Sequence, residues 1–211
     1  MERVICLILG YVFGLFQTSY FYGKLKGIDI RDYGSGNSGS TNTLRVMGKK
    51  AGAIVLVCDV LKAILACTLT RILFKNSPDM VMLLVLYTGL GVVLGHNFPF
   101  YMNFKGGKGV AATGGVIIAL FDFRIFIICL AVLVLTVFIT RFVSLGSILG
   151  MIAFLFTWTM SVADNRIAIG QDYALESCLV VFVFTALGIF RHRANILRLM
   201  TGTENKLGQK K

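Results

Sequence analysis

Charged residues are scarce in this sequence. Asp, Glu, Lys and Arg make up 15% of its 211 residues, whereas a soluble domain has about 25%. Hydrophobic residues make up 56%, and the mean hydropathy is +0.80. This composition excludes a soluble globular domain, a disordered chain and a disulfide scaffold. It predicts an integral membrane protein, so we interpret the net charge of +11 as unrelated to nucleic acid.

Metal-binding and disulfide patterns are also missing. All five cysteines lie inside apolar stretches, their number is odd, and no C-x-x-C occurs. Neither an H-E-x-x-H pattern nor an acidic calcium loop is present. We therefore predict no metal site.

Long apolar stretches dominate the rest of the chain. A membrane-crossing helix needs about 20 mostly apolar residues. The fourth stretch is shorter and is followed by Asp122 and Arg124, which predicts a short helix or half-span; the alternative is five spans, with the fourth and fifth stretches merged or re-entrant. We predict an all-α, polytopic helical bundle of about seven transmembrane or half-spanning helices, forming a single domain over residues 1–211. The candidate spans are Val4–Tyr22, Ala51–Leu73, Met80–Phe98, Val110–Phe121, Ile125–Thr140, Val143–Ala163 and Tyr173–Phe190.

Lys and Arg are distributed unevenly between the two sides of such a bundle. With seven crossings, 15 of them fall in the loops 23–50, 99–109 and 141–142 and the tail from Arg191, and five fall on the other side. The basic excess marks the cytoplasmic side, so we predict an outside N-terminus and a cytoplasmic C-terminus. The first stretch could instead be a signal peptide, but no A-x-A site follows it, and we expect it to be retained.

The first polar cluster on the basic side is Tyr33–Arg45, Y-G-S-G-N-S-G-S-T-N-T-L-R. Glycines permit positive φ, and successive N–H groups in such turns form anion-binding concavities. A following Arg can hold a phosphate bidentately. A flexible linker is the alternative, but the Asn, Thr and Arg side chains favour a phosphate site. The candidate ligands are Ser35, Gly36, Asn37, Thr41, Asn42 and Arg45.

The second cluster, Gly95–Thr113, contains a run of glycines and lysines directly before the short fourth stretch. A helix N-terminus preceded by glycines and lysines favours anion binding. The alternative is a basic anchor with a turn. A structural hydrogen bond is the favoured role for His96, with catalysis as the alternative. The candidate ligands are Lys105, Gly106, Gly107 and Lys108.

The third cluster is Arg191–Glu204. His192 and Asn195 are three residues apart, so one helical face can present both to a cytoplasmic pocket. The alternative is a basic segment that contacts anionic lipid headgroups. Ser144, at the start of the sixth stretch, could face the same pocket or cap its helix.

Two charges lie inside the second stretch. Asp59 and Lys62 are three residues apart, on one helical face. Because a charge inside a membrane is costly, we expect them to pair and to act as a scaffold behind the site.

Three blocks together resemble the signature blocks of the bacterial acyl-phosphate-dependent glycerol-3-phosphate acyltransferases. They are Gly34–Arg45, Gly95–Thr113 and Arg191–Glu204. The segment R-F-V-S-L-G-S and the Asp/Lys pair of the second stretch are also similar to the family's, so the resemblance covers essentially the whole chain. One departure is Ser40, where the family usually has Ala; it is conservative in size.

The resemblance implies transfer of a fatty acyl group from acyl phosphate to the 1-hydroxyl of glycerol 3-phosphate. The products are lysophosphatidate and phosphate, in phospholipid biosynthesis at the bacterial inner membrane, with the site facing the cytoplasm. Acyl-CoA and acyl-carrier protein are then not direct donors, in agreement with the missing H-x-x-x-x-D box. No cofactor is implied. The expected partners are the two substrates, membrane lipids and, as a candidate, an enzyme that makes acyl phosphate.

The residues are then assigned roles. Arg45, Lys105, Ser144, His192 and Asn195 are predicted to hold glycerol 3-phosphate, and the Ser35–Asn37 turn and the helix start at Lys108 to hold the acyl phosphate or product phosphate. The proton acceptor is either His192 or, slightly favoured, a phosphate oxygen of the donor; a Ser35 acyl-enzyme is a further alternative. The catalytic candidates are His192, Ser35, Lys105 and Asn195.

Two other functional classes remain as alternatives. One is a transporter or channel for a phosphorylated metabolite, and the other is a lipid-binding scaffold. A transporter needs polar residues at both faces, whereas the predicted outer links are short and all three clusters are predicted inside.

Overall fold

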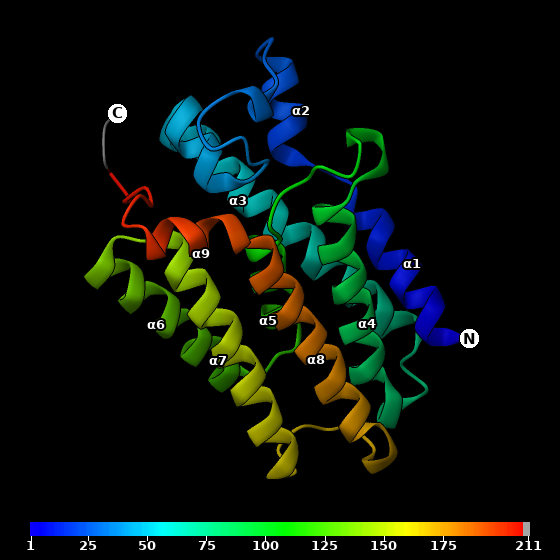
Figure 1. Cartoon of the computed structure of the whole chain (residues 1–211). Helices are drawn as coiled ribbons and strands as arrows, with labels where there is room; N and C mark the ends of the chain where they lie inside the picture. The colour runs from blue at the N-terminus through cyan, green and yellow to red at the C-terminus, as the bar shows by residue number, and fades with distance from the viewer. Residues whose placement is uncertain (209–211) are drawn as a thin grey trace. The chain divides into compact units, whose positions relative to one another are not determined.

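The computed structural model describes residues 1–208, and all regular structure in that part of the chain is helical (Figure 1). Within it, six segments are long and apolar enough to cross a membrane, and Val110–Ala119 is a shorter apolar helix. The prediction of an all-α bundle with about seven spanning or half-spanning helices is therefore confirmed. The chain divides into two compact units, Met1–Leu120 (unit 1) and Phe121–Lys211 (unit 2).

Unit 1 combines long helices with short helical turns in its loops. The helix α3 carries both predicted span charges, Asp59 and Lys62, and the short helix α5 packs against it. The elements are α1 (Glu2–Gly14), α2 (Thr18–Leu25), η1 (Ile30–Asp32), α3 (Ser40–Leu73), α4 (Pro78–Asn97), η2 (Phe100–Met102) and α5 (Val110–Ala119).

Helices α1 and α4 are in direct backbone contact. Gly10 and Gly14 on α1 face Gly91 and Gly95 on α4, each pair with the G-x-x-x-G spacing. A Cβ on any of the four would collide with backbone atoms of the opposite helix. Small residues of this spacing let two helices approach closely in a membrane, where lipid is as apolar as the side chains it would replace.

The first predicted span is confirmed as the membrane-length segment Glu2–Leu25, but two helices with a break between them build it. α1 ends at Gly14 and α2 begins at Thr18, and the N-cap Gln17 has the non-helical angles φ −95° and ψ 86°. The Gln17 side chain is buried and donates to the carbonyl of His96 at 2.9 Å, which fixes the break. The break also leaves the carbonyl of Phe16 as an acceptor for a side chain of α3.

The first polar cluster was also expected to be a loop throughout, and this is wrong for its second half. α3 begins at Ser40, and its first turns are separated from the span by a kink at Gly48, where φ is 86° and ψ is 179°. Glycine adopts this positive φ without the steric cost that a Cβ brings. Residues 40–47 are therefore a short helical segment that continues the polar loop.

The short helix α5 is separate from the next helix, so the five-span alternative is wrong. Phe121 has a positive φ of 57°, and the Asp122 side chain accepts from the N–H groups of Arg124 and Ile125 to cap the following helix. Inside unit 1, the guanidinium of Arg71 donates to the carbonyls of Ala119 at 3.0 Å and Leu120 at 3.3 Å. Arg71 therefore satisfies carbonyls that the end of a short helix leaves without helical partners.

Unit 2 is built around an apolar core. Phe154, Trp158 and Phe184 pack edge to face, and the indole N–H of Trp158 donates to Ser177 Oγ at 3.1 Å. His192 ends one helix and begins the next. The elements are α6 (Phe123–Thr140), α7 (Val143–Ala163), α8 (Gln171–Arg191) and α9 (Arg193–Met200).

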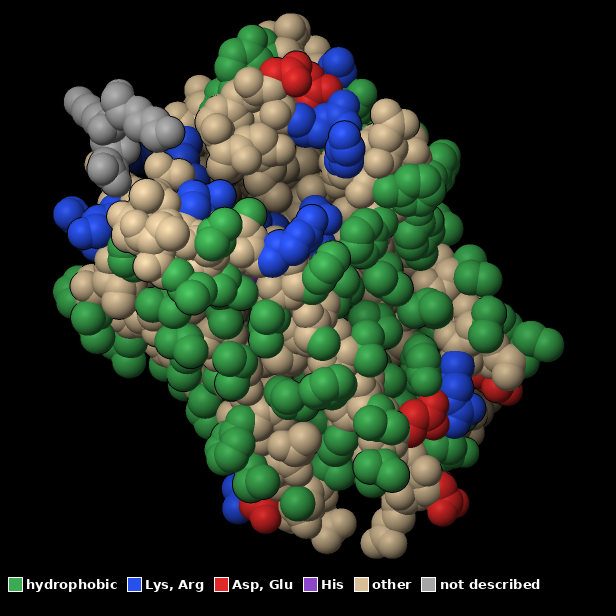
Figure 2. Space-filling view, in the orientation of Figure 1, with side chains coloured by type: hydrophobic (Ala, Val, Ile, Leu, Met, Phe, Trp, Pro, Cys, Tyr) green, Lys and Arg blue, Asp and Glu red, His purple; other side chains and the backbone are tan. Residues whose placement is uncertain are grey.

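Hydrophobic side chains cover much of the visible surface (Figure 2). On α6, for example, Phe138 is 83% exposed and Ile139 is 76% exposed. A soluble monomer rarely exposes apolar side chains over so wide an area. This surface matches the lipid-facing side that the composition predicts.

Candidate active site

The predicted site residues form two clusters, one in each unit. In unit 1 they lie on the segment Tyr33–Arg45, here the serine loop, and on the segment Lys105–Gly109, here the lysine loop. In unit 2 they lie on α7, α9 and the segment that follows α9.

Asn42 holds the serine loop in shape. Its Oδ1 accepts from the Ser35 N–H at 2.8 Å and the Ser35 Oγ at 3.1 Å. Its Nδ2 donates to the carbonyls of Ile30 at 3.2 Å and Tyr33 at 3.0 Å. At Gly34, φ is +62° and a Cβ would collide with Asn42 Oδ1. The loop is therefore a hydrogen-bonded turn around a buried amide, which the linker alternative does not account for.

Other members of the serine loop lie nearer the surface. Ser35, Gly36 and Arg45 are exposed, and Asn37 and Thr41 are half-buried. Arg45 makes no ion pair with any residue from 1 to 208. The guanidinium therefore retains its donors for an anion, whereas the Asn42 amide is occupied by the loop itself.

The lysine loop is tied to the end of α4. The N–H of Gly107 donates to the His96 carbonyl at 3.0 Å, and the N–H of Gly106 donates to the Asn97 carbonyl at 3.1 Å. Two of its backbone donors thus point to protein carbonyls. Lys105 is exposed and Lys108 is half-buried, and the loop leads into α5.

The two loops meet at Gly107. A Cβ there would collide with Nε2 of His96 and would lie 2.5 Å from the carbonyl oxygen of Ser38. Glycine at this position lets the lysine loop approach the backbone of the serine loop. The structure therefore brings together two polar blocks that are far apart in the sequence.

In unit 2 the predicted residues Ser144 and Asn195 share one carboxylate. Glu204 accepts from Ser144 Oγ at 2.9 Å, from Asn195 Nδ2 at 2.7 Å and from Arg198 Nε at 2.7 Å. Ser144 does not cap its helix, whose N-cap is Phe142, so the capping alternative is wrong. We did not predict Glu204 as a site residue; the one signal was an acidic residue at the end of a basic segment.

The Glu204 carboxylate is held in its ionised form. Burial acts to raise its pKa, but the hydrogen bonds from Asn195, Arg198 and Ser144 outweigh burial and lower the pKa below its ordinary value. Its negative charge therefore persists at neutral pH and holds α9 against α7.

His192 is buried at the junction of α8 and α9, with Nδ1 2.8 Å from the carbonyl oxygen of Gly188. Because a carbonyl only accepts, Nδ1 carries a proton, and in the neutral ring Nε2 then carries the lone pair. The N–H of Asn195 donates to the His192 carbonyl at 2.8 Å. The local fold thus orients the imidazole so that Nε2 is the nitrogen able to accept a proton.

Comparison with known proteins shows a match over nearly the whole chain. Residues 4–202 match the family model described as glycerol-3-phosphate acyltransferase. The glycerol-3-phosphate acyltransferase of Thermoanaerobacter sp. (strain X514) is 39% identical over 211 residues, covering 100% of this chain and 98% of that protein. That of Clostridioides difficile (strain 630) is 40% identical over 209 residues, covering 99% and 97%.

Solved structures agree with the sequence match. Two crystal structures of PlsY (YgiH), an integral membrane glycerol 3-phosphate acyltransferase, are similar to this chain with TM-scores of 0.83 and 0.81. Each is 33% identical, and the match covers 99% of this chain and 96% of that one. They are the glycerol 3-phosphate form and the lysophosphatidic acid form. With the apolar helices and the polar clusters described above, these matches show that the chain belongs to the glycerol-3-phosphate acyltransferase family and is an integral membrane acyltransferase.

Proposed function

We propose that this chain transfers a fatty acyl group from acyl phosphate to the 1-hydroxyl of glycerol 3-phosphate. Lysophosphatidate and phosphate are the products, which enter phospholipid biosynthesis. The observation that carries the proposal is the likeness to the PlsY crystal structures, whose two forms are named for an acceptor and an acylated product of such a transfer.

Unit 1 supplies the phosphate-binding groups in this proposal. Arg45 and Lys105 are exposed cations on the two loops that meet at Gly107, and Lys108 precedes the positive end of α5. A guanidinium can hold a phosphate through two parallel hydrogen bonds. Ser35, Gly36, Asn37 and Thr41 line the turn, and Gly106 gives the lysine loop its shape.

Unit 2 supplies the groups that handle the proton and orient the acceptor. Asn195 and Ser144 are fixed by Glu204, and the Nε2 of His192 can take a proton. A phosphate oxygen of the donor is the other acceptor and remains slightly favoured, because its second pKa is near ~6 if it resembles other phosphate monoesters.

The chemistry requires little beyond placement of two anions. The 1-hydroxyl oxygen attacks the carbonyl carbon of the acyl phosphate, the bond from that carbon to the phosphate oxygen breaks, and inorganic phosphate leaves. The hydroxyl proton passes to a phosphate oxygen or to His192. Because acyl phosphate is a mixed anhydride, the donor itself drives the transfer. Holding the reactants in contact can lower the barrier by about 7–11 kcal/mol.

The proposed setting is a bacterial inner membrane. The distribution of Lys and Arg supports an outside N-terminus and a cytoplasmic C-terminus, with catalysis at the cytoplasmic face. We propose that residues 1–211 act as one domain, with membrane lipids around it and an enzyme that makes acyl phosphate as a candidate supplier.

One assay tests the proposal. Purified protein in detergent or nanodiscs is given palmitoyl phosphate, and phosphate release is measured with and without glycerol 3-phosphate. We expect release that depends on glycerol 3-phosphate, with equimolar lysophosphatidate, and at least a 100-fold loss in Arg45→Ala. Phosphate release that does not depend on glycerol 3-phosphate would contradict the proposed acceptor. Activity with palmitoyl-CoA alone would contradict the proposed donor.

A second comparison identifies the proton acceptor. His192→Ala and His192→Gln are assayed at saturating glycerol 3-phosphate, with binding of that substrate measured separately. Loss of turnover in both variants at unchanged binding makes His192 the base, whereas retained turnover in His192→Gln supports the substrate phosphate as the acceptor.

A further inference from the structure

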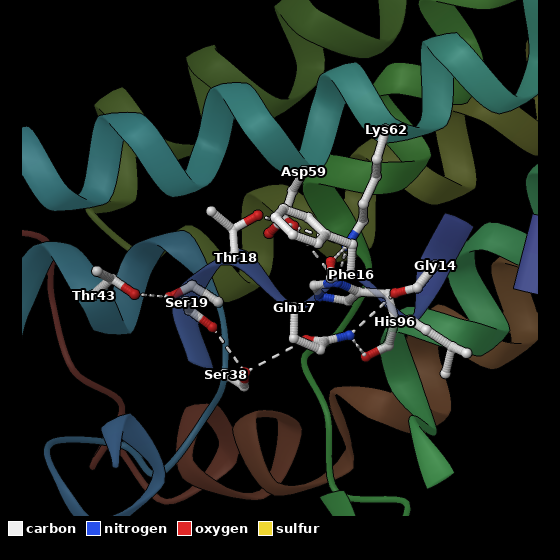
Figure 3. A network of polar contacts seen from close by, with 12 residues as sticks. Gly14, Phe16, Gln17, Thr18, Ser19, Ser38, Thr43, Asp59, Lys62 and His96 are labelled. Atoms are coloured by element: carbon white, nitrogen blue, oxygen red, sulfur yellow. Dashed lines mark hydrogen bonds and ion pairs between the residues drawn. The ribbon is translucent and has the colours of Figure 1, made fainter. Parts of the chain in front are cut away.

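Three ionisable side chains, those of Asp59, Lys62 and His96, lie together inside unit 1 (Figure 3). Asp59 is 1% exposed, Lys62 is 5% exposed and His96 is 3% exposed. The first two lie on α3 and the third near the end of α4. Charges inside a membrane protein are costly, so such a group calls for an explanation in function or in its partners.

Lys62 is the centre of this group. Its Nζ lies 2.8 Å from Asp59 Oδ1, 2.7 Å from the carbonyl of Phe16 and 2.9 Å from Nδ1 of His96. An ammonium group has three N–H donors, and these three acceptors use all of them. The predicted pairing of Asp59 with Lys62 is thus confirmed, but the pair has two further partners. Asp59 also accepts from Thr18 Oγ1 at 3.3 Å.

The contact with Lys62 sets the state of His96. With Lys62 as an ammonium, which only donates, Nδ1 of His96 is the acceptor, and this assigns the ring proton to Nε2. That nitrogen lies against Gly107, where it fills the space of a Cβ. The His96 carbonyl accepts from the Gly107 N–H at 3.0 Å, so both ends of His96 contact the lysine loop. These contacts agree with the expectation that His96 acts as a structural hydrogen-bonder.

A second branch reaches the serine loop. Gln17 Nε2 donates to the His96 carbonyl at 2.9 Å, and Gln17 Oε1 accepts from Ser38 Oγ at 3.4 Å. Ser38 Oγ is also 2.8 Å from Ser19 Oγ on α2. Gln17 and Ser38 are both fully buried. The same carbonyl therefore connects to both loops.

We infer that Asp59, Lys62, His96 and Gln17 are positioning residues for the acyl transfer: their contacts fix the spacing between the serine loop and the lysine loop. The inference rests on the proposed function for its kinetic consequence. A pair that merely joined two helices would bond across the middle of the helices. Here the bonds end instead at the break after α1, at the end of α4 and at the two loops.

The main variant removes both charges together. Asp59→Asn with Lys62→Met leaves no unpaired buried charge, so the helices can remain packed. We expect the KM for glycerol 3-phosphate to rise at least 10-fold, with kcat within threefold of wild type. A folded double variant whose KM stays within twofold of wild type would overturn the inference.

The matched control is Thr70→Val. Thr70 lies on α3 and is fully buried, and its hydroxyl bonds Thr88 Oγ1 on α4 at 2.6 Å and the Ala66 carbonyl on α3 at 3.2 Å. This variant removes a buried hydrogen bond from the same helix, and we expect its KM to stay within twofold of wild type. An equal rise in KM in Thr70→Val would mean that general destabilisation causes the effect, which also contradicts the inference.

Hydrogen–deuterium exchange tests whether the buried network positions the two loops, and this measurement does not depend on enzymatic activity. Amides at 35–38 and 105–109 should exchange at least fivefold faster in the double variant than in wild type or Thr70→Val, while α1 and α4 keep their protection. If the double variant does not fold, Gln17→Met replaces it, because it keeps both charges and removes the Gln17 amide that joins the His96 carbonyl to Ser38. Unchanged exchange at 35–38 in folded Gln17→Met overturns the inference. Absent wild-type activity, by contrast, overturns only the proposed function.

Discussion

The two units hold their polar clusters by opposite means. In unit 1 the helices α1 and α4 touch through glycines, and the charges Asp59 and Lys62 lie within the helical interior. In unit 2 the interior is apolar and aromatic, around Trp158, and the ionised carboxylate of Glu204 lies beyond α9. Unit 1 thus supports its loops from inside the membrane-spanning layer, whereas unit 2 supports its cluster from the polar segment itself.

The difference predicts where each unit is vulnerable. Damage to the helix packing of unit 1 should pass to its loops, because the buried network joins the two. Damage to the helix packing of unit 2 should leave its cluster in place, because Glu204 bonds Asn195 and Arg198 on α9 and Ser144 in the first turn of α7. Variants in each unit test this difference.

The largest effect is expected at the glycine contact of unit 1. In Gly91→Ala, the new Cβ would collide with the carbonyl of Leu7 and lie 2.8 Å from the backbone N of Tyr11. The two helix backbones must then separate. We therefore expect the free energy of unfolding to fall by at least about 3 kcal/mol, which is the upper end of the cost of overpacking. Thermal unfolding midpoints at one scan rate, in one detergent, measure the effect.

The matched control lies in unit 2. In Gly150→Ala the nearest atoms are Leu133 Cβ at 3.5 Å and the Cys129 carbonyl at 3.6 Å, which is ordinary contact. We expect the free energy of unfolding of this variant to stay within about 0.5 kcal/mol of wild type. If Gly91→Ala and Gly150→Ala proved equally damaging, the contrast between backbone packing and side-chain packing would be wrong.

The next largest effect is expected at Glu204. In Glu204→Gln, one amide oxygen replaces two carboxylate oxygens, so the new NH₂ group must face either the Arg198 donor or the donors of Ser144 and Asn195. We expect kcat/KM for glycerol 3-phosphate to fall 10- to 100-fold, which is about 1.4–2.8 kcal/mol of transition-state stabilisation. Steady-state kinetics in nanodiscs measure this loss.

Asp164→Asn is the control for that charge change. Asp164 pairs with Arg166 at 3.2 Å, and both side chains are more than half exposed. Exposed pairs contribute little, so activity should not change measurably. A Glu204→Gln variant with wild-type kinetics would show that the carboxylate does not place Ser144 and Asn195 for the reaction.

Much of the helical layout could be predicted from the sequence, because the spans are apolar and their ends are polar. The bounds Val143–Ala163 were predicted without error, since Arg141 precedes that stretch and Asp164 follows it. The break between α1 and α2 could not be predicted. Its residues continue an apolar pattern, and its cause is a hydrogen bond from Gln17 to a carbonyl 79 residues away.

In the site, too, local features could be predicted from the sequence, whereas contacts between distant residues could not. The pairing of Asp59 with Lys62 is local, three residues along one helix, and was predicted. The role of Glu204 depends on Ser144, 60 residues earlier in the chain, and the meeting of Gly107 with Ser38 depends on the tertiary fold. Residue types revealed the glycine- and lysine-rich loops, but not which of their N–H groups bond to the protein.

The smallest effect is expected at a half-buried ion pair of unit 1, Arg31 with Asp29, which contrasts with the fully buried pair of Asp59 and Lys62. Arg31 donates to Asp29 through Nε at 3.0 Å and Nη2 at 2.8 Å, and these hydrogen bonds lower the Asp29 pKa from 3.8 to about 2. A lowered folded-state pKa means that the stabilisation is complete above about pH 4 and is lost as the pH falls towards 2. Because the pair contacts solvent, we expect it to contribute about 1 kcal/mol or less to the free energy of unfolding. The unfolding midpoint of wild type should exceed that of Asp29→Asn by a few degrees at pH 6, and the difference should vanish as the pH approaches 2. A difference that stayed constant over this range would show that Asp29 stabilises the loop through its shape and not through its charge.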